Sequence, residues 1–97
     1  MDVISGPCEH GDYEANVAAA AKVAARLEAE GHEVFCPHTY FYGTTLGRDD
    51  ILAECLDRIT DSDTLHLLPG WQESPGAREE HAHAVALGKQ IFEVDVV

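Results

Sequence analysis

The stretch from residue 65 to residue 80 constrains the fold more than any other part of the chain. An apolar segment runs into a Pro-Gly turn, and a capped helix follows almost at once. Ser74 suits the N-cap of that helix, and Pro75 suits its first position, where no backbone N–H is needed. A strand, a tight turn and a helix within so few residues indicate a unit that folds back onto a sheet.

Other segments repeat this alternation and predict a fold class. Strands are expected at residues 3–5, 33–36 and 64–68 and within 90–97, and helices at 14–30, from Asp49 or Asp50 onward, and at 75–88. Between the second strand and the second helix we expect an aromatic, glycine-rich loop over 38–48. The chain therefore predicts one α/β domain over residues 1–97, with a parallel sheet of about four strands and helices on both faces.

Topology places a candidate site. Right-handed crossovers that cover both faces imply the strand order 2-1-3-4. The order of strands then reverses between the first and third strands, and ligands of such sheets bind there, outside the carboxyl ends of the strands. The two loops at this point, 6–13 and 69–76, are also the loops richest in Gly, Pro and small polar residues.

Composition limits the partners. The formal net charge of −12 argues against a nucleic acid polymer or an anionic membrane, because phosphate-rich surfaces need a basic footprint. No apolar run approaches the length of a membrane span, and the start of the chain lacks the apolar core of a signal peptide. Cys8, Cys36 and Cys55 are odd in number and widely spaced, which is typical of a reducing compartment. We therefore expect a cytoplasmic protein, and the charge does not exclude one small phosphorylated ligand held by backbone N–H groups.

Glu80 is the candidate catalytic residue. It falls on the inward stripe of its helix, which Ala77, Ala84 and Gly88 mark, whereas Glu79 and His83 should face outward. Acidic residues near a helix start can simply complement the dipole, and this explanation suffices for Glu79. For Glu80 the inward position favours a functional role.

The start of the same helix is a candidate anion site. Ser74 and Gly76 could bind an anion together with the free backbone N–H groups, although Ser74 also has an ordinary structural role as an N-cap. Gly6 would let a ligand approach the first loop closely, but Gly-Pro is also common in turns that bind no ligand.

Histidines and aromatic residues give weaker signals. The six histidines lack the spacing of a closed zinc site, so we expect neither a metal nor a cofactor. Tyr40, Tyr42 and Trp71 could contact a base or a partner subunit, and packing is the alternative explanation for aromatic side chains of this kind.

Several motifs resemble those of a family of small domains of unknown function that is frequent in phages and prophages. This family in turn resembles the nucleoside 2-deoxyribosyltransferase superfamily, which includes the 2'-deoxynucleoside 5'-phosphate N-hydrolases. The resemblance covers nearly the whole chain and rests on Ile4-Ser5-Gly6-Pro7, Asn16, Gly31-His32-Glu33-Val34, Pro37, Leu67-Leu68-Pro69-Gly70-Trp71 and Ser74-x-Gly76-Ala77-x-x-Glu80.

The resemblance implies a fold, an activity and a site. It implies a flavodoxin-like or Rossmann-like three-layer sandwich, and cleavage or transfer at the N-glycosidic bond of a deoxynucleoside or its 5'-monophosphate, with Glu80 as nucleophile. It also implies a homo-oligomer, with a dimer as the first expectation. Our candidate for the segment that reaches the partner is the loop at 40–42. Ligand and phosphate contacts would come from Ser5, Gly6, Pro7, Ser74, Gly76 and Ala77.

Two departures from the superfamily pattern keep alternatives open. The Tyr that usually hydrogen-bonds the nucleophile is replaced by Val3, and the Asp usually found on the second helix is replaced by Cys55. Asp57 is only two residues from that position but should face elsewhere. These departures favour a non-catalytic nucleotide-binding module, the retained Glu80 favours an enzyme, and a structural oligomerisation domain is the third alternative.

Overall fold

The computed structural model describes residues 1–9 and 11–95 and has the predicted alternation of strands and helices. Its elements follow the chain in this order: β1 Asp2–Ser5, α1 Tyr13–Ala29, β2 Val34–Phe35, α2 Pro37–Tyr40, α3 Arg48–Thr60, β3 Thr64–Leu67, the 3₁₀ turn η1 Trp71–Glu73, α4 Pro75–Ala86 and β4 Gln90–Glu93.

All four strands form one parallel sheet in the order β2-β1-β3-β4, which confirms the predicted order. In the register of the two central strands, Val3 lies opposite Leu65 and Ser5 lies opposite Leu67. The arrangement agrees with a flavodoxin-like sandwich.

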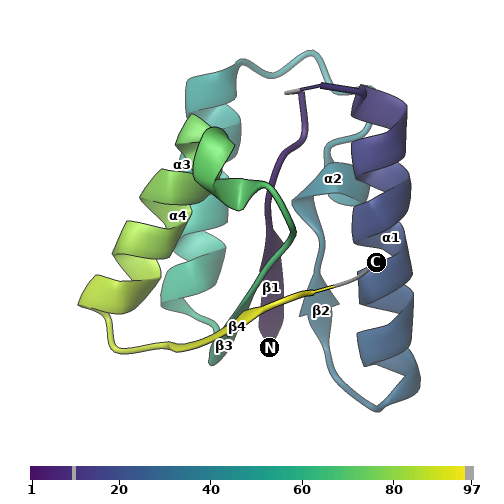
Figure 1. Cartoon of the computed structure of the whole chain (residues 1–97). Helices are drawn as coiled ribbons and strands as arrows, with labels where there is room; N and C mark the ends of the chain where they lie inside the picture. Colours follow the sequence, from purple (N-terminus) through teal and green to yellow (C-terminus); the bar gives the residue numbers. More distant parts are fainter. Residues whose placement is uncertain (10, 96–97) are drawn as a thin grey trace.

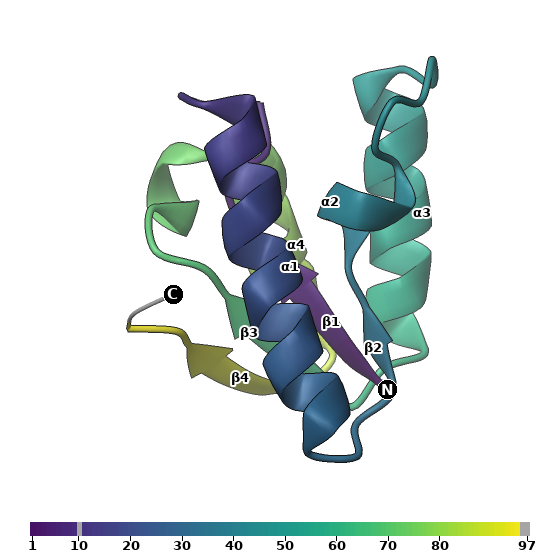
Figure 2. The ribbon, with the colours of Figure 1, turned by 90° about the vertical axis from the view of Figure 1, so that its right-hand side faces the viewer.

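Helices cover both faces of the sheet, with α1 on one side and α3 and α4 on the other (Figures 1 and 2). Successive residues of β1 point to opposite faces, as the pleat of a strand requires. Ile4 packs against Val23 of α1, whereas Val3 packs in a second cluster with Ile59 of α3 and Ala84 of α4. The core is therefore divided into two apolar layers by the sheet.

Helix α3 begins earlier than predicted, and neither Asp49 nor Asp50 is its cap. Gly47 occupies the N-cap position with an extended backbone, and both aspartates lie in the first turn. Carboxylates there complement the positive end of the helix dipole, so the pattern indicated the helix but not its first residue. The short helix α2 was also missed, because Pro37 opens it inside a segment expected to be a loop.

Three other boundaries differ from the prediction. Strand β2 is only Val34–Phe35, and β4 ends at Glu93, while the end of its predicted range, 96–97, lies outside the described residues. Helix α4 ends at Ala86, so Gly88 is not on the inward stripe but lies in the following turn with a φ of 69°. That left-handed conformation suits glycine at a helix end.

His83 is half-buried rather than outward, because its Nε2 lies 2.9 Å from the hydroxyl of Thr60 on α3.

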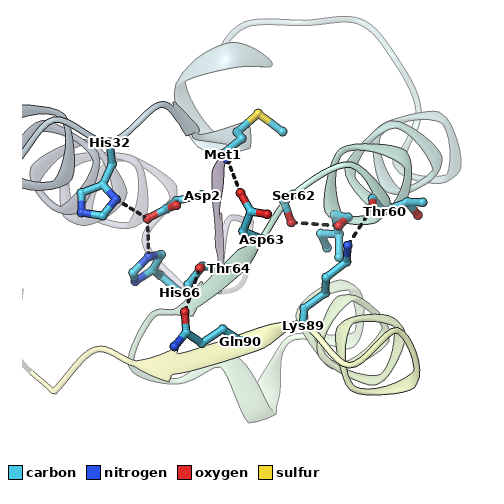
Figure 3. A network of polar contacts seen from close by, with 11 residues as sticks. Met1, Asp2, His32, Thr60, Ser62, Asp63, Thr64, His66, Lys89 and Gln90 are labelled. Carbon is cyan, nitrogen blue, oxygen red and sulfur yellow. Dashed lines mark hydrogen bonds and ion pairs between the residues drawn. The ribbon is translucent and has the colours of Figure 1, made fainter.

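The amino ends of the strands carry a polar network (Figure 3). The buried carboxylate of Asp2 lies 3.0 Å from His66 Nε2 and 3.2 Å from His32 Nδ1, and the terminal amino group pairs with Asp63 at 2.9 Å. These contacts leave the Asp2 carboxylate with partners, as a buried charge requires. The network is at the opposite end of the strands from the predicted site, and we assign it a structural role.

None of the helices in the described part of the chain is both long enough and apolar enough to cross a membrane.

Candidate functional site

A pocket of about 600 Å³ lies beyond the carboxyl ends of the strands, at the predicted position. The loop after β1 and the start of α4 supply two of its walls, as expected. The segment from Pro37 to Arg48, the first half of α3 and Tyr13 at the start of α1 complete it, and of these sequence reasoning had proposed only Tyr40 and Tyr42 as possible contacts. The residues that line it include Gly6, Cys8, Glu9, Tyr13, His38, Phe41, Tyr42, Arg48, Cys55, Ser74, Gly76, Ala77 and Glu80.

Glu80 faces the pocket from α4 and is only 8% exposed, which confirms its predicted inward position. Small residues one turn away on each side, Ala77 and Ala84, are also buried and let the helix lie close to the sheet. Glu79 is exposed, as predicted.

Two side chains hold the Glu80 carboxyl group. The hydroxyl of Ser5, at the end of β1, donates to Glu80 Oε1 over 2.6 Å, and the thiol of Cys55 on α3 hydrogen-bonds to the same group. Burial raises the pKa of Glu80 to about 7, and the hydrogen bonds from Ser5 and Cys55 only partly offset this effect. Burial and the nearby carboxyl raise the pKa of the Cys55 thiol, so it stays protonated and can donate.

Val3 and Ser5 have different neighbours, although both belong to β1. Val3 lies on the same face of β1 as Ser5 but packs in the apolar cluster with Cys55 and Ile59. Ser5, two residues further along the strand, makes the contact with Glu80 instead. Asp57 is exposed, as predicted, and does not line the pocket.

The start of α4 borders the same pocket. The Ser74 hydroxyl accepts a long hydrogen bond of 3.4 Å from the Ala77 N–H, so the residue is an N-cap as well as a lining residue. A Cβ built on Gly76 would meet no atom within 4 Å, so this glycine is not required by packing. It leaves the helix end open to a ligand.

Gly6 has a different explanation from the one expected. A Cβ at this position would lie 2.6 Å from the Cβ of Leu68, far inside contact distance. The glycine is therefore required by the close packing of the β1 and β3 ends, although it also lines the pocket. The next residue, Pro7, does not line the pocket, but its carbonyl lies 2.9 Å from His38 Nε2.

Of the three aromatic residues proposed for base or interface contacts, only Tyr42 lines the pocket. Its ring stacks on Tyr13 at 5.7 Å between centroids, and its hydroxyl donates to Glu14 over 2.8 Å. Tyr40 instead packs on Phe35.

Trp71 also lies outside the pocket. Its ring contacts His81 at 4.5 Å between centroids, and its indole N–H donates to Glu93 over 3.0 Å. A base contact from Tyr40 or Trp71 therefore has no support in the geometry, whereas an interface role for either stays a prediction.

Sequence reasoning missed several lining residues, including Tyr13, His38 and Arg48. Arg48 carries the one permanent positive charge in the described lining and pairs with Glu9 at 3.7 Å. These residues come from segments that meet only in the folded chain, and the run of aromatic residues near them was the one local signal available.

Within residues 1–9 and 11–95, no group of three or more His, Cys, Asp or Glu side chains is arranged to hold a metal ion. The chemistry of the described pocket therefore rests on one buried carboxyl group, its thiol and hydroxyl partners, a helix N-terminus and one arginine.

Residues 3–93 match the family model of a domain of unknown function, DUF4406. The chain belongs to this family. No curated protein matches the sequence.

Proposed function

We propose that this DUF4406 protein cleaves, or transfers at, the N-glycosidic bond of a deoxynucleoside or its 5'-monophosphate, with Glu80 as the nucleophile. The observation that carries the proposal is a buried carboxyl group, held by Ser5 and Cys55, facing a pocket that also receives the N-terminus of α4. A carboxylate is the usual nucleophile when positive charge develops on a sugar.

The chemistry balances without a cofactor. An oxygen of ionised Glu80 attacks the anomeric carbon while the C–N bond breaks, and the bonding electrons leave with the base, which takes a proton from water. The resulting glycosyl ester is then hydrolysed by water or transferred to a second base. With a pKa of about 7, Glu80 is about half ionised at neutral pH.

The start of α4 and Arg48 suit the phosphate of a monophosphate. Free N–H groups at a helix N-terminus attract anions. Because Gly76 has no side chain, a phosphate can approach these N–H groups. Arg48 lines the same pocket and adds a positive charge. This matches the role that the resemblance implies for the Ser74-x-Gly76 motif and for Glu80.

A second candidate function is binding without turnover. It is favoured by one observation: a thiol, which stays protonated, stands where the resembling enzymes usually carry an Asp. The pocket would then retain the ligand and lose the chemistry.

Base release distinguishes the two candidates. The protein is incubated with deoxynucleosides and their 5'-monophosphates, and free base is measured by chromatography. We expect release by the wild type, a rate that rises with pH through about 7, and a loss of about a thousandfold or more in Glu80→Gln. Glu79→Gln, an exposed neighbour on the same helix, is the matched control. Binding without release by the wild type would leave the second candidate.

A further inference from the structure

His38 is a buried residue in the pocket lining to which the proposed chemistry assigns no role. It lies in α2, is 3% exposed, and its Nε2 lies 2.9 Å from the carbonyl oxygen of Pro7. A carbonyl oxygen can only accept, so Nε2 carries the proton. In the neutral ring Nδ1 is then a hydrogen-bond acceptor.

The ring is neutral for a physical reason. Burial lowers the pKa of His38, and this effect exceeds the opposing one of the backbone carbonyls of Pro7 and Gly6. A second proton would reside on Nδ1, which has no hydrogen-bond partner among the described residues. Nδ1 therefore keeps its lone pair.

Nδ1 of His38 is the one buried side-chain polar atom without a hydrogen-bond partner in the part of the chain that the structure describes. The other buried polar groups that define the pocket and the sheet ends, such as Glu80 and Asp2, have partners. Leaving a buried acceptor unpaired is unfavourable, because the atom loses its hydrogen bonds to water and gains none in the protein. An unpaired acceptor on a pocket-lining residue indicates that its partner comes with the ligand.

We propose that His38 Nδ1 accepts a hydrogen bond from the bound ligand, from either a sugar hydroxyl or a base N–H, and so contributes to ligand selection. This inference rests on the proposed function, because it takes the ligand to be a nucleoside or nucleotide. His38 follows β2, Ser5 ends β1 and the start of α4 follows β3. The strand order β2-β1-β3 therefore places Ser5 between His38 and the start of α4. A ligand with its phosphate at α4 and its anomeric carbon at Glu80 extends toward His38.

Access to Nδ1 requires a small adjustment, because the atom has almost no exposed surface in the ligand-free pocket. The ring must yield slightly along the pocket wall while Nε2 keeps its bond to Pro7. The new hydrogen bond offsets the cost of this movement by satisfying the unpaired acceptor.

Calorimetry with matched ligands tests the proposal. The probes are 2'-deoxyadenosine 5'-monophosphate, its 2',3'-dideoxy analogue without a sugar hydroxyl, and its N6,N6-dimethyl analogue without a base N–H. We expect one analogue to bind the wild type about tenfold more weakly than the parent, and which one it is identifies the donor. In His38→Leu the difference should disappear, because this side chain has no acceptor in place of Nδ1, whereas His38→Gln, whose amide offers both a donor and an acceptor, should keep part of it. His83→Gln, which alters a histidine of α4 that contacts Thr60 and does not line the pocket, should keep the difference.

A direct readout does not depend on the variant folding. In wild-type protein labelled with ¹⁵N-histidine, the unprotonated nitrogen of His38 should be Nδ1, and its resonance should move on addition of the parent ligand but less with the weaker analogue. If the difference between the analogues is the same in His38→Leu as in the wild type, or if the Nδ1 resonance does not move when the parent ligand binds, this inference alone is overturned. If none of the four common deoxynucleoside monophosphates binds, both this inference and the proposed function are rejected.

Discussion

The buried position of Glu80 could be predicted from the sequence. A carboxyl on the inward stripe of a helix, between two alanines, is a departure from core composition that periodicity alone can detect. Its partners were harder to predict. Ser5 was expected at the site but not as a donor to Glu80, and Cys55 was identified only by its position relative to Asp63. Contacts between distant segments have no local signature.

The raised pKa of Glu80 has a consequence for stability. Its pKa is about 7 in the folded protein against 4.5 for the free side chain, so the folded state binds the proton more tightly. The favourable contribution is complete below pH 4.5 and is lost as the pH rises to about 7, a change on the order of 3 kcal/mol. The Gln side chain in Glu80→Gln does not titrate. The free energy of unfolding of this variant should therefore rise relative to that of the wild type as the pH rises from 4.5 to about 7. Urea denaturation at pH 5, 6, 7 and 8 measures the difference.

The exposed neighbour again provides the control for this prediction. Glu79→Gln should differ from the wild type by the same small amount at every pH. A constant difference between Glu80→Gln and the wild type would mean that the folded-state pKa is not raised.

At the scale of elements, the sequence predicted kinds and order better than ends. The order of strands followed from crossover handedness, and the long helices from their apolar stripes. The first residue of α3 was wrong because an aspartate is as favourable in the first turn as at the cap. Helix α2 was missed because four residues are too few to show a period.

The start of α4 gives a prediction that separates packing from ligand contact. Gly76→Ala places a methyl group where no atom lies within 4 Å, so stability should be kept or slightly raised. If a phosphate lies at this helix end, affinity for a monophosphate should fall by about tenfold, because the methyl group occupies its path. Thermal denaturation and calorimetry on the same variant measure both effects.

Gly6→Ala is the matched opposite. Its Cβ would lie 2.6 Å from the Cβ of Leu68, so we expect a loss of about 1–3 kcal/mol of stability from overpacking. Unchanged monophosphate affinity in Gly76→Ala would argue against a phosphate at the α4 N-terminus.

At the scale of the whole molecule, large apolar side chains remain exposed at several places. Leu46 is in the segment that borders the pocket, Val85 and Leu87 are at the end of α4, and Phe92 is on the edge strand β4; each is close to half exposed. A small domain buries a smaller fraction of its surface than a large one. We predict self-association, with a dimer as the first expectation. Sedimentation at high micromolar concentration tests it, and a species of 10.5 kDa would contradict it.

The net charge of the whole molecule affects its affinity for an anionic ligand. With a formal net charge of −12 the protein repels a dianion at long range, whereas the α4 N–H groups and Arg48 attract it within the pocket. The Debye length is about 8 Å at physiological salt, so distant carboxylates count for little against direct contacts. Glu80 is the exception, because it lies in the same pocket and ionises near neutral pH.

We therefore expect a 5'-monophosphate to bind better than its nucleoside, but only by about tenfold. Ser74→Ala removes the lining hydroxyl and the cap of α4, and should reduce this preference. Calorimetry that gives equal affinities for the two ligands would instead indicate a pocket specific for nucleosides.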